Sequence, residues 1–298
     1  MATAGKKIYE WDKNPRLPVP APPPGSCDCQ FHIYGDPENF PPRANAPYPP
    51  ITSASFAEAQ RMHRAIGFQR GVIVHSAIYG SDHRLLLHAL ESLGDRERYR
   101  GIAIVDDKVS DAELARLHAA GVRGARFNFV RFFALEQRAA EVRRSMARLR
   151  ELGWHARLHV NGDDLLENSK LLRSIKDVPM VIDHFGHVGF EGGMDRPAIR
   201  WVRETLAQEN WWVMISNGNR DSKMDAGWDD AVPYGKAFIE AAPDRIVWGS
   251  DWPHPQWSKR MMNDAEEVEL LYRYVDHDAG LLQKILVENP ARLHGFEH

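Results

Sequence analysis

Short apolar runs alternate with longer segments in which apolar residues recur every three or four positions. The run at 71–75 (GVIVH) is continuously apolar, which is typical of a strand buried on both faces of a parallel sheet. One helical pattern follows Ser55 and ends before Gly67, and both residue types favour the ends of helices. The predicted strands lie at 27–33, 71–75, 99–105, 124–127, 155–160, 178–184, 211–216 and 245–249, and the predicted helices at 56–66, 82–93, 110–121, 135–152, 165–175, 197–208, 232–241, 266–274 and 281–286.

Eight strand–helix units in one chain predict an α/β fold, a closed (β/α)8 TIM barrel in a single domain. The alternative is a doubly wound open sheet, but no glycine-rich nucleotide-binding turn follows the first strand. Residues 1–25 contain the segment LPVPAPPPG, whose prolines favour an extended arm over a helix. We therefore expect a Pro-rich N-terminal arm at 1–25 and the barrel at 26–298.

The composition is that of an ordinary soluble globular protein, with 43% hydrophobic and 27% charged residues. A formal net charge of −3 gives no basis for binding nucleic acid or an acidic membrane, and no apolar run is long enough to span a bilayer. The N-terminus lacks the apolar core of a secretory signal. Cys27 and Cys29 are separated by one residue in a predicted strand, where a disulfide seldom forms, so we expect reduced thiols and a cytoplasmic enzyme.

Polar residues stand at the C-terminal ends of most predicted strands, which is the end where barrel enzymes place their active sites. Gln30 and His32 end the first strand and face the same side, because side chains alternate along a strand. Asp251 follows the eighth strand, where a single aspartate would ordinarily form a turn. So many polar strand ends are hard to explain by packing, and they predict one pocket. The other strand ends carry His75, Ser76, Arg126, Asn128, His159, His184, Ser216 and Asn217.

Four motifs together resemble those of the amidohydrolase superfamily, over nearly the whole chain after the arm. They are CDCQFHIYG at 27–35, VIDHFG at 181–186, WGSDWPH at 248–254 and ENPARL at 288–293. The segment GARFNFV at 124–130 and the loop that begins at Tyr48 are most similar to the 2-pyrone-4,6-dicarboxylate lactonase group. That group includes relatives that act on sulfomuconolactone and on sugar-acid lactones. The resemblance implies a hydrolase for a small anionic lactone in the catabolism of aromatic compounds.

The sequence departs from the superfamily where the superfamily usually binds metal. A His-x-His pair commonly opens the first strand, but Gln30 replaces its first histidine, and glutamine is a poor zinc ligand. Members of the lactonase group work without a metal, so the resemblance implies no cofactor. A weak mononuclear site for a divalent metal such as zinc is the alternative, with His32, His159, His184 and Asp251 as its ligands.

Opening a lactone requires an activated water and a stabilised carbonyl oxygen. We predict that Asp251 is the general base and that His32 and His184 polarise the carbonyl. Substrate carboxylates call for guanidinium groups, which predicts roles for Arg126 and for loop residues Arg131 and Arg220. The other predicted substrate-binding residues are Gln30, Tyr48, Ser76 and His159, where Tyr48 and Ser76 match positions that contact substrate in the family.

The same residues would serve three other functions. One is an isomerase that moves a sugar-acid lactone linkage without net hydrolysis, and another is a zinc-dependent hydrolase or decarboxylase. The third is a barrel that binds a sugar or an acid without catalysis. The expected partner is a small anionic lactone, with neither nucleic acid nor membrane, and a homo-oligomer is left open.

Overall fold

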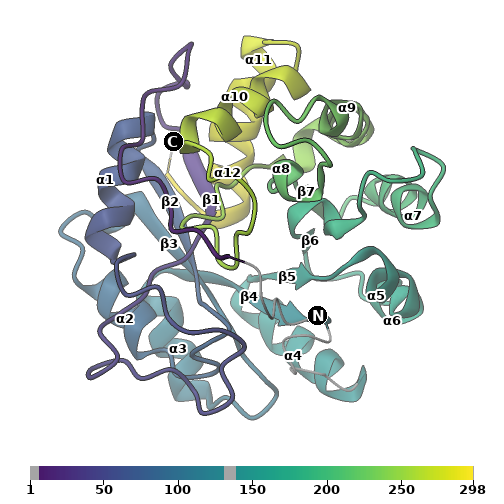
Figure 1. Cartoon of the computed structure of the whole chain (residues 1–298). Coiled ribbons are helices and arrows are strands. Elements are labelled where there is room, and N and C mark those ends of the chain that lie inside the picture. Colours follow the sequence, from purple (N-terminus) through teal and green to yellow (C-terminus); the bar gives the residue numbers. More distant parts are fainter. Residues whose placement is uncertain (1–6, 131–138, 298) are drawn as a thin grey trace.

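The computed structural model describes residues 7–130 and 139–297, and its strands form a ring with helices on the outside (Figure 1). Eight parallel strands are hydrogen-bonded in chain order from β1 to β8, which confirms the predicted (β/α)8 barrel. The strands are β1 Cys27–Phe31, β2 Arg70–Val74, β3 Tyr99–Ala103, β4 Val122–Asn128, β5 His155–His159, β6 Met180–Ile182, β7 Trp211–Met214 and β8 Ile246–Val247.

The helices follow the predicted pattern, with differences at some ends. Ser55 caps the first helix through a hydrogen bond to the backbone N–H of Glu58, and Gly67 ends it in a left-handed conformation (φ 81°). The helix predicted at 165–175 is two short helices, and the start predicted at 135 lies outside the described residues. The helices are α1 Phe56–Ile66, α2 Arg84–Glu91, α3 Asp111–Ala119, α4 Ala139–Leu152, α5 Gly162–Glu167, α6 Ser169–Arg173, α7 Pro197–Leu206, α8 Gly218–Asp221, α9 Val232–Ala241, α10 Asp264–Tyr274, α11 Ala279–Gln283 and α12 Asn289–His294.

The barrel closes through the segment that follows β8. The backbone N–H of Cys29 donates to the carbonyl of Trp248 (3.0 Å), and that of Asp251 donates to the carbonyl of Gln30 (2.8 Å). Gly249 allows this approach, because a Cβ placed there would lie 2.5 Å from the Cβ of Gln30 and 2.7 Å from its backbone nitrogen. The loop that carries Asp251 is therefore joined directly to the first strand.

Alternate strand positions fill two separate apolar cores. Ile73 of β2 contributes to the large core between the sheet and the helices, whereas its neighbours Val72 and Val74 belong to a small core inside the ring. Residues 155, 157 and 159 of β5 share the inward face, and all three are polar. The small core comprises Cys27, Cys29, Val72, Val74, Ile102, Val181, Trp212, Met214, Val247, Ala291 and Phe296.

The described part of the Pro-rich arm packs against its own chain. The backbone N–H of Tyr9 donates to the carbonyl of Trp257 (2.9 Å), and the ring of Trp11 meets that of Trp252 edge to face (4.8 Å). Arg16 pairs with Glu269 of α10 (2.6 Å). The arm thus contacts both α10 and the loop after β8. Among the residues described, no helix has the length and apolar character needed to cross a membrane.

Candidate active site

A cavity of about 200 Å³ opens at the C-terminal ends of the strands and collects most of the predicted site residues. Asp251 lies on its wall together with residues from β4, β5 and the turns after β6 and β7. The predicted residues Gln30 and Ser76 are buried behind this wall, and Arg131 lies outside the described residues. The lining comprises His32, Tyr48, Ala77, Arg126, His159, His184, His187, Asn217, Arg220, Asp251, Pro255 and Gln256.

Asp251 is 6% exposed and has donors on both carboxylate oxygens. The Asn217 amide donates to Oδ2 (2.8 Å), and an Arg220 guanidinium nitrogen lies 3.5 Å from the same atom. Burial favours the neutral acid, but the electrostatic pull of His184, His32 and Arg220 outweighs it and holds the pKa of Asp251 well below its usual range. Asp251 is therefore a carboxylate at neutral pH.

Hydrogen bonds assign different tautomers to the two histidines beside Asp251. The Nδ1 atom of His32 lies 2.7 Å from the carbonyl of Val74 and must donate to it, so neutral His32 has a lone pair on Nε2. The Nδ1 atom of His184 lies 2.7 Å from Oγ of Ser216 and 3.1 Å from the Asn217 amide nitrogen. Because the amide can only donate, we assign Nδ1 as the acceptor, so a neutral His184 carries its proton on Nε2. These Nε2 atoms lie 3.4 and 3.7 Å from Oδ1 of Asp251. His184 thus presents a donor at this position, and the bond to Val74 orients the ring of His32.

The C-terminal ends of the strands, where the cavity opens, are called the barrel mouth below. Burial keeps two of the histidines at the mouth uncharged. It lowers the pKa of His184 and of His159 well below the usual range for histidine, so both imidazoles are neutral near pH 7. The Nδ1 atom of His159 lies 2.7 Å from Oδ1 of Asn128, which fixes the orientation of its ring. Asp251 stays ionised beside these rings because the N–H that His184 directs toward it, the Asn217 amide and the Arg220 guanidinium all favour its charged form.

Two arginines are held by one buried aspartate that the sequence did not single out. Nε of Arg126 donates to Oδ2 of Asp183 (3.0 Å), and Nε of Arg157 donates to Oδ1 (2.6 Å). Asp183 is fully buried, so the two guanidinium groups offset the cost of burying its charge. Arg126 reaches the cavity from this anchor, whereas Arg157 stays inside the barrel and donates to Oε1 of Gln30 (2.6 Å).

The side-chain amide of Gln30 lies beside the residues that the alternative prediction named as metal ligands. Its amide nitrogen lies 3.4 Å from Nε2 of His32 and 3.5 Å from both Nε2 of His184 and Oδ1 of Asp251. Because Arg157 holds the amide oxygen on the other side, the group that faces these three atoms donates protons and has no lone pair for a cation. Gln30 therefore adds no ligand atom to the set that the alternative prediction named, which is His32, His159, His184 and Asp251.

Tyr48 lines the cavity from a loop, whereas Arg220, which was predicted in a loop, lines it from the short helix α8. Other contacts hold both side chains in place. The Tyr48 hydroxyl lies 3.1 Å from Oγ of Ser76, and burial raises the pKa of Tyr48, so the phenol stays protonated. The Arg220 guanidinium stacks over the ring of Trp257 (5.1 Å) and donates to the carbonyl of Pro255 (3.2 Å). Both side chains are therefore positioned as donors toward a ligand.

Two of the lining residues that received no predicted role are Asn217 and His187. Asn217 is one of the polar strand ends identified in the sequence, but no function was assigned to it. The ring of His187 lies 5.2 Å from that of His184. The turn at Phe185 and Gly186 takes positive φ values, and no sequence signal predicts where such a turn directs the next side chain.

The chain is similar to known proteins over nearly its whole length. The family model described as amidohydrolase matches residues 27–296. The chain is 35% identical to a 4-sulfomuconolactone hydrolase of Rhizobium radiobacter, over 92% of this chain and 91% of that one. It is 33% identical to a 2-pyrone-4,6-dicarboxylate hydrolase of Comamonas testosteroni (96% and 95% covered). It is 26% identical to a D-galactarolactone isomerase of Agrobacterium fabrum (93% of each).

Proposed function

This chain belongs to the amidohydrolase family, and from that premise we propose that it opens a small carboxylated lactone by hydrolysis. The substrate class is 2-pyrone-4,6-dicarboxylate-like or muconolactone-like. One observation carries the proposal: an ionised Asp251 faces the same small cavity as the guanidinium groups of Arg126 and Arg220. Such a cavity offers a base for water and cations for the carboxylates of an anionic ring.

In the proposed reaction Asp251 accepts a proton from a water molecule as the water oxygen bonds to the lactone carbonyl carbon. The carbonyl oxygen gains negative charge and is stabilised by the N–H that His184 directs into the cavity. The bond between that carbon and the ring oxygen then breaks, and the ring oxygen takes up the proton that Asp251 accepted from water, which returns Asp251 to its ionised form. Arg126 and Arg220 hold the substrate carboxylates, and Tyr48 donates to the ring. The bond from Nδ1 of His32 to the carbonyl of Val74 positions its Nε2 beside Asp251.

We propose that this chemistry needs no metal. The orientation of Gln30 supports the proposal, because a proton donor stands where a ligand oxygen would be needed. The test is turnover of the enzyme before and after chelation, at a temperature well below its melting temperature and with metal content measured in both samples. Unchanged kcat in metal-depleted protein is expected, and activity that returns only with added metal would refute it.

The function itself is tested by a screen of carboxylated lactones followed by NMR. Ring-opened product is expected from at least one dicarboxylated pyrone or muconolactone. In water enriched in oxygen-18, hydrolysis places one labelled oxygen in the new carboxylate. If none of these lactones is opened while the folded protein still binds them, the proposal is wrong and the chain is a binding protein.

The second candidate function is lactone isomerisation, which the similarity to the D-galactarolactone isomerase favours. The same base and donors would move an ester linkage within the substrate without adding water. The labelling experiment separates the two, because an isomerised lactone forms without oxygen-18 in its carboxyl groups.

A further inference from the structure

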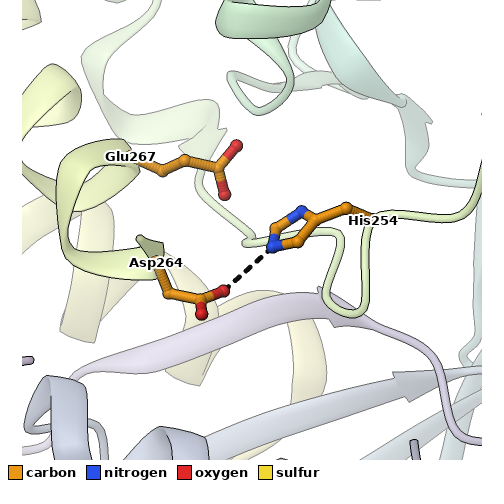
Figure 2. Close-up of side chains that lie close together, drawn as sticks. All are labelled: His254, Asp264 and Glu267. Atoms are coloured by element: carbon orange, nitrogen blue, oxygen red, sulfur yellow. Dashed lines mark hydrogen bonds and ion pairs between the residues drawn. The ribbon is translucent and has the colours of Figure 1, made fainter. Parts of the chain in front are cut away.

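A second group of chemically capable side chains lies outside the active-site cavity, and we propose that it binds a divalent transition-metal ion of the zinc type. His254 from the loop after β8 and Asp264 and Glu267 from α10 would be the ligands, as Figure 2 shows. None of the three lines the cavity. The site is separate from the barrel-mouth residues and from the proposed lactone chemistry.

The three side chains converge in the protein interior. His254 is 1% exposed, Asp264 0% and Glu267 5%. One ligand atom from each lies within 4.8 Å of the others, and Nε2 of His254 is 3.0 Å from Oδ1 of Asp264. Within residues 7–130 and 139–297, no other group of three or more histidine, cysteine or acidic side chains has this spacing. A separation near 3 Å is that of neighbouring ligands around one ion.

Each of the three residues also has a polar atom that finds no partner. Within the described chain, Nδ1 of His254, Oδ2 of Asp264 and Oε2 of Glu267 are buried and make no hydrogen bond. Buried polar atoms are normally paired, and unpaired carboxylate oxygens are especially unfavourable. A cation among these residues would contact the carboxylates and remove that cost.

The charges of the group point to the same kind of ligand. Two carboxyl groups face one imidazole, and among the described residues no lysine or arginine pairs with Asp264 or Glu267. The remaining partner is the neutral amide of Asn219, which donates to Oε1 of Glu267 (2.5 Å). One imidazole nitrogen with two carboxylate oxygens suits zinc better than calcium, which prefers oxygen ligands alone.

The position of the group indicates what the ion would do. His254 comes three residues after Asp251, and its backbone N–H donates to the Asp251 carbonyl (2.8 Å). Asn219 precedes Arg220 in α8. An ion held here would tie the loop after β8 to α10 and, through Asn219, to α8, so it would brace the segments that carry Asp251 and Arg220 without touching a substrate.

The first test is metal binding by the full-length protein, with zinc added to chelator-treated samples and bound metal measured after gel filtration. We expect one zinc per chain in the wild type and in Asp251→Asn, whose barrel mouth is altered. We expect loss of that zinc in Glu267→Gln and full retention in the control Glu240→Gln, an exposed glutamate of α9. Loss of zinc in Asp251→Asn with retention in Glu267→Gln would place the ion at the mouth and overturn the proposal.

The second test uses only the wild type, so it does not depend on the folding of a variant. Crystals grown with zinc are measured at the zinc absorption edge, and the anomalous signal locates the ion. A peak between His254 and Asp264 supports the proposal, and absence of a peak there overturns it. Zinc is also expected to raise the melting temperature of chelator-treated wild type and to leave kcat unchanged, which distinguishes this site from failure of the proposed lactone chemistry.

Discussion

Two histidines of β5 share one strand and one face but meet different surroundings at the two ends of the barrel. His159, at the mouth, is oriented by Asn128 and borders the cavity. His155, at the opposite end, packs against the ring of His294 (4.9 Å), and no side chain of the described residues hydrogen-bonds either of its ring nitrogens. Burial lowers the pKa of both, and that of His155 falls to about 3.

The difference shows that a buried polar residue inside a barrel does not by itself mark a functional site. The mouth histidines are held in defined tautomers by carbonyl and amide groups and face an open space. At the N-terminal end of the strands, called the floor below, His155 and His294 face only packed groups. One of these is Arg157, whose positive charge disfavours protonation of either imidazole. The hydrogen-bond partners of a buried histidine, and the end of the strand at which it lies, distinguish a candidate catalytic residue from one that only packs.

The largest expected effect tests whether the mouth is catalytic. Asp251→Asn removes the proposed base and keeps the shape of the side chain, so kcat should fall by about a thousandfold. Substrate binding, measured by calorimetry, should persist because Arg126 and Arg220 remain. His155→Leu at the floor is the matched control, with kcat expected to stay close to that of the wild type. Equal losses of kcat in the two variants would contradict the proposal that the catalytic residues lie at the mouth alone.

The next largest effect tests the close approach that shapes the mouth. Gly249→Ala adds a Cβ 2.5 Å from that of Gln30. Relieving this overlap must shift the backbone, which should reduce the free energy of unfolding by about 1–3 kcal/mol and displace Asp251 from its partners. Denaturant titration and kcat report the two consequences. A variant with wild-type stability and turnover would show that β1 and the loop after β8 tolerate separation.

His155 at the floor is expected to make the free energy of unfolding depend on pH below neutrality. The unfolded chain protonates His155 near its ordinary pKa of 6.5, whereas the folded chain does so only at about 3. Stability is therefore lost as pH falls below 6.5, by about 2 kcal/mol between pH 7 and pH 5 for this one group. Denaturant unfolding of His155→Leu should show a pH dependence weaker by that amount. The exposed His88→Leu serves as control, and an identical acid loss in all three proteins would contradict the assignment.

The smallest effect concerns the cationic wall of the mouth. Arg220→Lys keeps the charge but removes the planar group that stacks on Trp257, so KM for a carboxylated lactone should rise about tenfold with a smaller change in kcat. Steady-state kinetics measure the effect, and Arg200→Lys on the exposed face of α7 is the control. A drop in kcat with unchanged KM would assign Arg220 to the chemical step instead.

Local patterns predicted the barrel and much of its mouth. Strand ends and the rule for barrel sites together anticipated His32, Arg126, His159, His184 and Asp251 on one cavity, and the structure gathers all five there. Their chemical roles remain predictions.

The buried ion-pair network could not be predicted from the sequence, because its members are far apart along the chain. Asp183 has its meaning only beside Arg126 and Arg157 from two other strands, which no spacing along the chain reveals. Periodicity also cannot distinguish the two ends of one strand face, so His155 and His159 look equivalent until their neighbours are known. The turn that directs His187 into the cavity depends on positive φ values, and these occur here at a phenylalanine as well as a glycine.

The hydrogen bond from the Asp251 backbone to Gln30 makes closure of the ring and assembly of the reactive group a single event. A chain that has formed every strand but has not yet joined its first to its last contains all the side chains of the mouth and no working arrangement of them. Turnover during refolding should therefore appear only once β1 is hydrogen-bonded to the segment after β8, so activity reports whether the barrel is closed.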